Sequence, residues 1–323
     1  MNTHTLPQSV GSLIAGKDVT GSGHRIPVYY PATGAQISTL HEADAAEVDL
    51  AVAAARRSFD TTDWPRWSVE RRQALLLAIS ETLLAHADEL ALLECYNLGI
   101  SLRELRQIQM TRAAYNFRFF AEYLGQRSGE VYDQVTGYRS VVVREAVGVA
   151  ALIAPWNAPT ALASMKVAAA LAFGNTCVLK PSEQTPLALR RFVELLHEAG
   201  LPEGVVNLVN GRGSVTGEAL VAHRGVDLVS FTGGTETGRR IMTGAAQRLK
   251  PCSLELGGKS ANVIFASADL DRALDAALLA IFSGNGQQCL AGSRILLEKS
   301  ISEAFLARFA DRARQLRIGD PML

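Results

Sequence analysis

The sequence predicts an α/β protein in which helices cover a Rossmann-like parallel sheet. Two observations support this prediction: short apolar runs alternate with helical segments from Gly148 onward, and a polar or glycine-rich turn follows most of those runs. Such alternation is typical of parallel strands that are buried on both faces. A chain of 323 residues, 48% of them apolar, is long enough for one large or two ordinary domains.

The first part of the chain is mainly helical after a few short strand-like pieces. Asp44 and Glu47 form a capping-box pattern at the start of one helix, and Ser68 caps a second. A third helix stops at Gly99, and a fourth spans 102–124. The fourth carries an aromatic residue every four positions, a stripe that we interpret as core packing: Tyr115, Phe119 and Tyr123.

A β-hairpin is predicted at 131–145, where two β-rich runs flank Thr136 and Gly137. Two strands alone are marginal in water, so we expect the hairpin to pair with another element. Parallel strands are then expected at 149–154, 176–180, 205–209, 226–231 and 252–256, with helices between them at 160–173, 186–199, 214–222 and 236–247. The remaining elements are strands at 261–265 and 294–297 and helices at 269–281 and 302–316.

Charge and composition exclude several classes of function. Lys+Arg and Asp+Glu both number 32, and nucleic acids and anionic membranes require a basic excess that this chain lacks. Four widely separated cysteines and six scattered histidines suggest neither a disulfide framework nor a metal site. The N-terminus has no secretory pattern, and no stretch is apolar enough to span a bilayer. We therefore expect a cytoplasmic protein.

Ligands of parallel sheets bind beyond the carboxyl ends of the strands, where two glycine-rich turns are candidate phosphate cradles. Gly213 and Gly217 belong to one, and Gly233 and Gly234 precede a helix in the other. A helix start offers free N–H groups and a positive dipole end to a phosphate. Neither turn fits the dinucleotide fingerprint, and plain turns remain the alternative for both.

Lys180 and Glu183, which follow the second parallel strand, are candidate ribose ligands. An ammonium donates to hydroxyls and a carboxylate accepts from them, and the carboxylate would repel a 2′-phosphate, favouring NAD over NADP. The alternative is a solvated ion pair at a strand end.

Three residues are candidates for the chemistry. Cys289 lies in the uncharged stretch SGNGQQCLAG and is a candidate nucleophile, with a buried structural thiol as the alternative. Glu255 ends an apolar strand and is either a general base whose pKa is raised by burial or an edge carboxylate facing water. Asn157 can donate an amide N–H to an oxyanion, although asparagine is also common in turns.

The motifs APWNAP, KPSEQTP, SFTGGTETG, LELGGKS and GQQCLAG occur in one order, and this combination resembles the aldehyde dehydrogenase superfamily. The resemblance covers nearly the whole chain, from the helices after Asp44 to IGDP near the end. Each motif is weak alone, whereas the ordered set is specific. The segments NFRFFAE, SFTGGTETGRRIM and ALDAALLAIFS suggest the branch that acts on semialdehydes of the carboxymethyl-hydroxymuconic type.

The resemblance implies a mechanism in which Cys289 attacks an aldehyde, Asn157 and the Cys289 backbone N–H hold the oxyanion, and Glu255 activates the water that releases the acid. It implies a small-molecule aldehyde as substrate, NAD as cofactor with NADP less favoured, and a homo-oligomer of the complete protein. The cofactor-binding positions that it implies are Ala154, Pro155, Trp156, Lys180, Ser182, Glu183, Gly213, Gly217, Phe231, Thr232, Gly233, Gly234 and Leu256. At Gly234 many relatives carry a phosphate-binding serine.

The resemblance also divides the chain into an NAD-binding domain at 1–130 and 146–254, an oligomerisation hairpin at 131–145, and the N-terminal portion of a catalytic domain at 255–323. Family chains continue beyond IGDP, so we expect the second domain to be incomplete. Two alternatives stay open: a CoA-acylating dehydrogenase on the same fold, and an inactive fragment that only binds nucleotide or associates.

Overall fold

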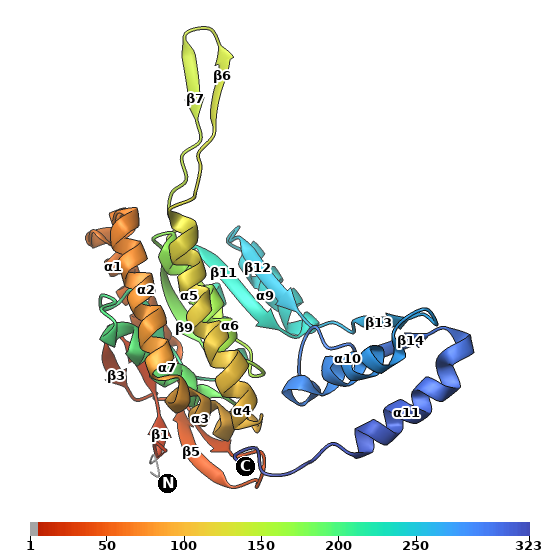
Figure 1. Ribbon diagram of the computed structural model, residues 1–323. Helices are drawn as coiled ribbons and strands as arrows, with labels where there is room; N and C mark the ends of the chain where they lie inside the picture. Colours follow the sequence, from red (N-terminus) through yellow and green to blue (C-terminus); the bar gives the residue numbers. More distant parts are fainter. Residues whose placement is uncertain (1–5) are drawn as a thin grey trace.

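A seven-stranded sheet forms the centre of the computed structural model, which describes residues 6–323 (Figure 1). The first five residues of the predicted NAD-binding domain lie outside the described residues. The strand order is β12-β11-β8-β9-β10-β2-β3, and the first five of these strands run parallel. Their bounds are β12 Cys252–Leu256, β11 Leu228–Gly233, β8 Val149–Ile153, β9 Thr176–Lys180, β10 Val206–Leu208, β2 Ser12–Ile14 and β3 Lys17–Val19.

Helices cover both faces of this sheet, because side chains alternate between the two faces along each buried strand. On one face, α1 (Ala45–Thr61), α8 (Glu218–Ala222) and α9 (Thr235–Ala246) pack on Val149, Ala151 and Ile153. Ala150 and Leu152 point to the other face, which is covered by α2 (Val69–Ala85), α3 (Ala87–Leu98), α5 (Thr111–Leu124), α6 (Pro159–Ala172) and α7 (Pro186–Glu198). The predicted sheet with helices on both faces is confirmed.

The capping residues and the glycine identified in the sequence mark the helix ends correctly. Asp44 and Glu47 form the capping box of α1, and the Ser68 hydroxyl accepts from the Arg71 backbone N–H in α2. Gly99 ends α3 with a φ of 68°, a left-handed conformation that suits glycine. The predicted helix at 102–124 is divided into α4 (Leu102–Glu104), a π-helical segment η2 (Leu105–Met110) and α5.

The aromatic stripe of α5 is on the surface, so its interpretation as core packing was wrong. Tyr115 is 50% exposed, Phe119 45% and Tyr123 43%. The buried side of α5 consists of smaller residues around Phe117, which is fully buried. Helical spacing showed that the three aromatic side chains share a face, but α5 has apolar residues on two faces and spacing could not tell which one is buried.

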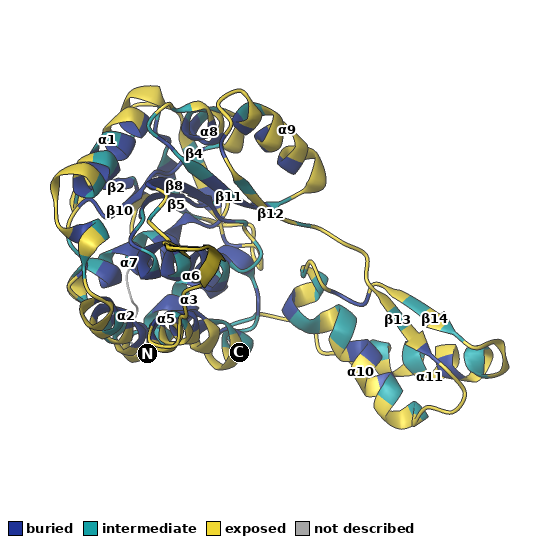
Figure 2. Ribbon diagram, turned by 90° about the horizontal axis from the view of Figure 1, so that it is seen from above, coloured by how far each residue is buried: buried dark blue, intermediate teal, exposed yellow. Residues whose placement is uncertain are grey.

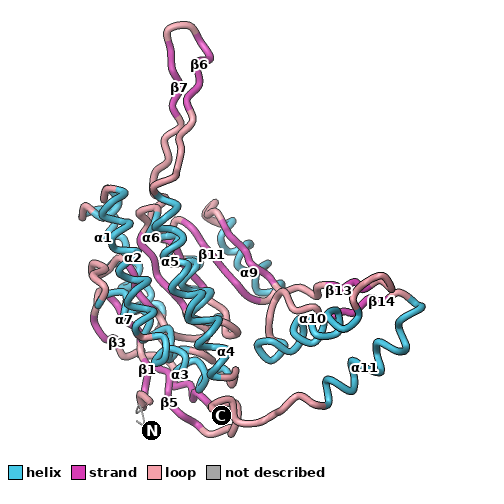
Figure 3. The backbone as a smooth tube through the Cα atoms, in the orientation of Figure 1, coloured by secondary structure: helices cyan, strands magenta, loops and turns pink. Residues whose placement is uncertain are grey.

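The predicted hairpin is formed by β6 (Val131–Val135) and β7 (Tyr138–Val141), which project away from the sheet (Figures 1 and 3). Every residue of the two strands is exposed, and within residues 6–323 they pair only with each other. Their exposed apolar side chains include Val131, Val135, Tyr138 and Val141.

The C-terminal elements form a smaller unit beside the main sheet (Figure 2). Two parallel strands, β13 (Ala261–Ile264) and β14 (Arg294–Leu297), pack with α10 (Leu270–Phe282) and α11 (Ser302–Arg314) around Phe305. Near the N-terminus, β1 (Ser9–Val10), β5 (Gln36–His41) and β4 (Arg25–Tyr29) form a separate three-stranded sheet. Short helical turns complete the chain: η1 Trp64–Arg66, η3 Gly213–Gly217, η4 Ser283–Gly286 and η5 Lys299–Ile301. Among the described residues no helix has both the length and the apolar character to cross a membrane.

Candidate active site

The predicted site residues gather at one edge of the sheet because β8, β9, β11 and β12 are parallel and end there. Ile153 pairs with Lys180, and Thr232 pairs with Glu255. Asn157 follows the end of β8 by four residues. The strand register therefore assembles turns that are as much as about a hundred residues apart in the sequence.

The stretch that carries Cys289 extends from α10 across this edge. Gly284, Asn285 and Gly286 adopt left-handed conformations, with φ of 57°, 56° and 72°, and turn the chain sharply after α10. The Asn157 side-chain amide donates a hydrogen bond of 2.6 Å to the Gln287 carbonyl, two residues before the cysteine. A Cβ at Gly258 would lie 3.3 Å from the Cys289 carbonyl oxygen, so the turn after β12 also meets the stretch.

The Cys289 thiol is exposed, whereas Cys95 and Cys177 are buried. The alternative of a buried structural thiol at position 289 is therefore wrong. Asn157 has a second amide N–H besides the one bonded to Gln287, and an amide nitrogen donates two hydrogen bonds. The hydrogen bond between Asn157 and Gln287 therefore brings the Asn157 amide to within two residues, along the chain, of the exposed Cys289 thiol.

Glu255 is exposed rather than buried, which corrects the expectation of a general base tuned by burial. The physical reason is its position on β12, which is an edge strand that pairs only with β11 within the described residues. Alternate β12 residues are exposed. Within residues 6–323, Glu255 is therefore an edge carboxylate facing water, which was the alternative prediction.

A cleft of about 760 Å³ opens between η3–α8 and α9. Its walls include four residues of the predicted cofactor set: Glu183, Gly213, Gly217 and Phe231. Arg212, Ile241 and Val221 add a cation and apolar surface. A mainly apolar cleft with a few polar groups is the usual form of a ligand site.

Lys180 is only 2% exposed, so the alternative of a solvated ion pair is wrong. Its ammonium group donates to the Pro181 carbonyl at 2.8 Å and lies 3.6 Å from the Glu183 carboxylate. Burial lowers the pKa of Lys180, and the Glu183 carboxylate opposes that shift. The ammonium group thus holds Glu183 at the cleft wall.

The two glycines at the end of β11 differ in their surroundings. A Cβ at Gly233, the last residue of β11, would lie 2.4 Å from the tip of the Phe231 ring, so a larger residue there would displace that ring. At Gly234, the N-cap of α9, a Cβ would have nothing within 4 Å, and no side chain caps the helix. The helix start is therefore open to an outside acceptor of hydrogen bonds.

The other predicted cofactor positions lie along the same edge. Ala154 is buried, and its N–H donates to the Lys180 carbonyl at 3.0 Å, which joins the two turns. Trp156 is 41% exposed, and the buried Thr232 hydroxyl has no partner among the described residues. The remaining positions, Pro155, Ser182 and Leu256, are partly buried.

Comparison with known proteins identifies the family. The model described as the aldehyde dehydrogenase family matches residues 19–323. This chain belongs to the aldehyde dehydrogenase family. Its similarity to 5-carboxymethyl-2-hydroxymuconate semialdehyde dehydrogenase of Escherichia coli is 43% identity over 317 residues, which are 97% of this chain and 66% of that protein. Betaine aldehyde dehydrogenase of Bacillus subtilis (strain 168) is 42% identical over 286 residues, 88% of this chain and 58% of the relative.

Solved structures of aldehyde dehydrogenases and related proteins have the same fold as this chain. The crystal structure of PnpE in complex with nicotinamide adenine dinucleotide has a TM-score of 0.94 and 43% identity, covering 98% of this chain and 64% of that one. An NAD⁺ complex of the aldehyde dehydrogenase of Bacillus cereus has a TM-score of 0.95 at 36% identity, again over 98% and 64%. The chain therefore spans less than two thirds of the length of these relatives.

This aldehyde dehydrogenase chain also contains a buried lysine, Lys166, for which the sequence predicted no role. Lys166 lies on α6 and donates to the Ser230 hydroxyl at 2.9 Å. Burial lowers its pKa to about 8, against the opposing effect of the Glu255 carboxylate. The sequence signal that could have predicted this buried lysine is a single charged residue, Lys166, within the otherwise apolar helix α6.

A second unpredicted group in this family member is Glu94 of α3, which is completely buried and accepts the Thr160 backbone N–H at 2.6 Å. Burial raises the pKa of its carboxyl from 4.5 to about 7, although the bonds from Thr160 oppose the shift. A carboxyl with a higher pKa in the folded state stabilises the fold fully below about pH 4.5, and that contribution is lost as the pH rises through about 7.

We expect Glu94→Gln, which cannot titrate, to remove a stability loss of the order of 3 kcal/mol between about pH 4.5 and pH 8. Urea unfolding of the two proteins across that range measures the effect. Stability curves that stay parallel would show that Glu94 does not titrate there.

Proposed function

We propose that this protein oxidises an aldehyde to a carboxylate with reduction of NAD, through a covalent intermediate on Cys289. The observation that carries the proposal is the Asn157–Gln287 hydrogen bond, which joins a fixed amide donor to the stretch that presents an exposed thiol. The cleft between η3–α8 and α9 begins at the same sheet edge. A nucleophile, an oxyanion donor and a nucleotide-sized cleft together suit aldehyde oxidation.

In the proposed mechanism, the Cys289 thiolate attacks the aldehyde carbon, forming a C–S bond and an oxyanion. The second N–H of Asn157 and the Cys289 backbone N–H hold that oxyanion. Bound NAD would supply the hydride acceptor for the carbon that Cys289 holds, and loss of that hydride would leave the acyl group on Cys289 as a thioester. Glu255 then removes a proton from a water molecule, whose oxygen attacks the thioester and releases the carboxylate and the thiolate.

The cleft fits the cofactor. Glu183 lines the cleft and would accept a hydrogen bond from a ribose hydroxyl, and the open start of α9 at Gly234 would offer N–H groups to a phosphate. A carboxylate at Glu183 would repel a 2′-phosphate, which favours NAD over NADP. PnpE and the Bacillus cereus relative have been solved with this dinucleotide, which supports the assignment.

We propose an aldehyde that also carries a carboxylate as substrate, as in the printed name of the Escherichia coli relative. Arg112 of α5 supports this class. It is exposed and makes no ion pair within residues 6–323, and it lies one turn before Asn116, whose amide bonds the Ala161 carbonyl of α6. The Asn116–Ala161 and Phe120–Phe173 contacts show that α5 and α6 run in the same direction, so we expect Arg112 near the start of α6, which follows the Asn157 turn.

Arg112→Met should therefore lower kcat/KM for carboxylated semialdehydes by about 10- to 100-fold, the value of one charge-assisted contact, and leave neutral aldehydes of equal length nearly unchanged. Steady-state assays with both substrate types measure the ratio. Arg118→Met, on an exposed part of the same helix, is the matched control. An equal loss for both substrate types would contradict the assignment.

Two alternatives have distinct signatures. A CoA-acylating enzyme would release an acyl-CoA and would not require Glu255, and a nucleotide-binding or associating chain would form no NADH with any aldehyde. We favour hydrolysis because Glu255 pairs in register with Thr232 at the same sheet edge. We also propose a cytoplasmic homo-oligomer without nucleic-acid partners, in which the exposed apolar hairpin β6–β7 contributes to the interface.

The test is aldehyde-dependent formation of NADH by the intact protein as its gene encodes it, with product analysis in the presence and absence of CoA. Carboxylate release without CoA supports the proposal. Nucleotide binding without NADH formation, over a panel of aliphatic, aromatic and carboxylated aldehydes, would overturn it.

A further inference from the structure

Two of the helices that follow site turns, α6 and α7, lack side-chain caps at their own N-cap residues. α6 begins after the Asn157 turn and α7 after the Lys180–Glu183 turn; each has proline as its first residue. Neither N-cap residue, Ala158 or Thr185, accepts a hydrogen bond with its side chain. Backbone N–H groups at a buried helix start need a partner, so another element must supply it.

One face of α3 supplies both partners. Glu94 accepts the Thr160 N–H of α6 at 2.6 Å, and Asn97 accepts the Leu187 N–H of α7 at 3.0 Å. The two side chains are three residues apart, which places them side by side on a helix, and both are buried. α3 thus caps two helices that each carry a turn of the site.

The end of α3 reaches the third part of the site. The Gly99 carbonyl, at the C-cap of α3, accepts a hydrogen bond of 2.9 Å from the Asn285 side chain. Asn285 is the middle one of three left-handed residues, 284–286, that turn the chain toward Cys289. Asparagine tolerates this conformation better than most residues, so the same residue supplies both the turn and the bond.

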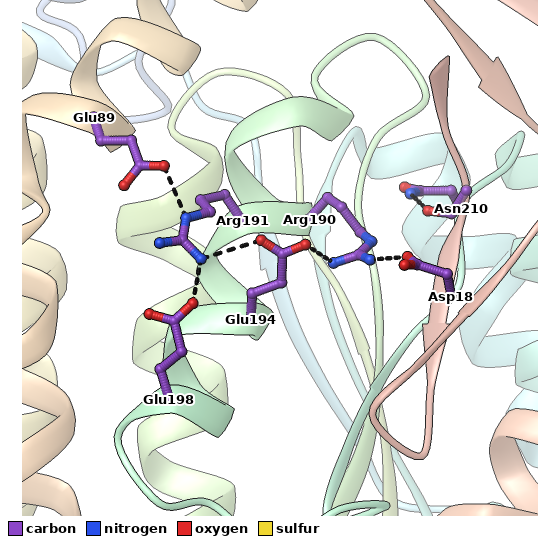
Figure 4. Close-up of polar contacts among 8 residues, drawn as sticks. Asp18, Glu89, Arg190, Arg191, Glu194, Glu198 and Asn210 are labelled. Atoms are coloured by element: carbon purple, nitrogen blue, oxygen red, sulfur yellow. Dashed lines mark hydrogen bonds and ion pairs between the residues drawn. The ribbon is translucent and has the colours of Figure 1, made fainter. Parts of the chain in front are cut away.

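α3 itself is held firmly against α7. Figure 4 shows Arg191 of α7 between three carboxylates, one of them Glu89 of α3 at 2.8 Å. The others are Glu194 at 3.2 Å and Glu198 at 2.5 Å, both on α7. Leu90, Cys95 and Leu98 bury the rest of α3 in the main core.

We propose that α3 with Gly99 is a brace that sets the relative position of the Asn157 turn, the Lys180–Glu183 turn and the Cys289 stretch. Glu94, Asn97 and Asn285 are its positioning residues. The roles of the three turns rest on the proposed function, whereas the brace acts on their geometry. Because a displacement of about 1 Å at a reacting group costs about 100-fold in rate, three bonds to one rigid helix matter for the chemistry.

The brace predicts that each residue affects a different measurement. Glu94→Met should slow hydride transfer in a single turnover at least about tenfold, with little change in NAD affinity. Asn97→Leu should weaken NAD binding at least about fivefold, because the ribose turn shifts. Asn285→Gly, which keeps the left-handed turn but loses the bond to Gly99, should change the rate of Cys289 alkylation by iodoacetamide about threefold or more.

Conservative variants and a matched control separate positioning from stability. Glu94→Gln keeps an oxygen acceptor for the Thr160 N–H and should restore hydride transfer to within about threefold of wild type. Leu90→Ala, a cavity variant of the same helix, should lower Tm without changing the three readouts at temperatures well below it. Isothermal titration of NAD and the alkylation rate need no aldehyde, so they test the brace even if aldehyde oxidation fails.

Two results would overturn the brace. One is a set of variants that lower only Tm and leave hydride transfer, NAD affinity and alkylation unchanged. The other is Glu94→Gln behaving like Glu94→Met. Absence of aldehyde oxidation in the wild type, with NAD binding and alkylation responding as predicted, would instead overturn the proposed function alone.

Discussion

Replacing Cys289 with serine should lower aldehyde oxidation at least about a thousandfold and leave NAD affinity unchanged. The sulfur of the exposed Cys289 is the only group of the stretch 283–292 that can form a thioester, and an unactivated hydroxyl is a far poorer nucleophile near neutral pH. The cofactor cleft lies between η3–α8 and α9 and contains no atom of this stretch. Steady-state NADH formation and titration of NAD measure the two properties.

Cys252→Ser is the matched control, because Cys252 is the other cysteine that is not fully buried. That thiol lies at the start of β12, at the opposite end of the strand from the site edge, and its replacement should leave turnover within about twofold of wild type. Turnover that survives in Cys289→Ser, or that is lost equally in both variants, would contradict a covalent mechanism on Cys289.

Glu255→Gln should preserve the first burst of NADH and slow the steady state by about 100- to 10,000-fold, the range of a general base. The glutamine cannot take a proton from water, so the thioester accumulates after the first hydride transfer. Rapid mixing with excess aldehyde measures the burst, and denaturing mass spectrometry of the quenched protein detects the acyl group on Cys289.

Glu303→Gln, an exposed carboxylate in the first turn of α11, is the control and should behave like the wild type. An unchanged steady state in Glu255→Gln would show that another group activates the water. A steady state restored by added CoA, with acyl-CoA as product, would favour the acylating alternative instead.

Much of the fold could be predicted because its signals are local. The apolar runs after Gly148 became the parallel strands β8 to β12, and Asp44, Ser68 and Gly99 mark helix ends as expected. A helix cap or a buried strand depends on a few neighbouring residues, so a short segment of the sequence is enough to predict it. The parallel order of the strands then followed from the connecting helices.

The candidate site was predicted in outline for the same reason. Turns that follow parallel strands must share one edge, and the structure places Asn157, Lys180 and Thr232 there, with Glu255 beside Thr232. The exposure of Glu255 was not readable, because it depends on β12 being the edge strand of the sheet. The residues next to Glu255 in the sequence do not indicate whether β12 lies at the edge or in the middle of the sheet.

By itself the sequence determined the types of the helices and strands and the sheet edge at which the turns meet. It also contained an ordered set of motifs that matches one family. Each of these features depends on residues that are close together in the sequence. Only the tertiary structure decided that the Tyr115 stripe faces outward and that Lys166 is buried beside Ser230. It alone decided that Glu94 caps a helix 66 positions away. These features arise from contacts between distant segments, and whether a face or a charge is covered depends on which partner folds over it.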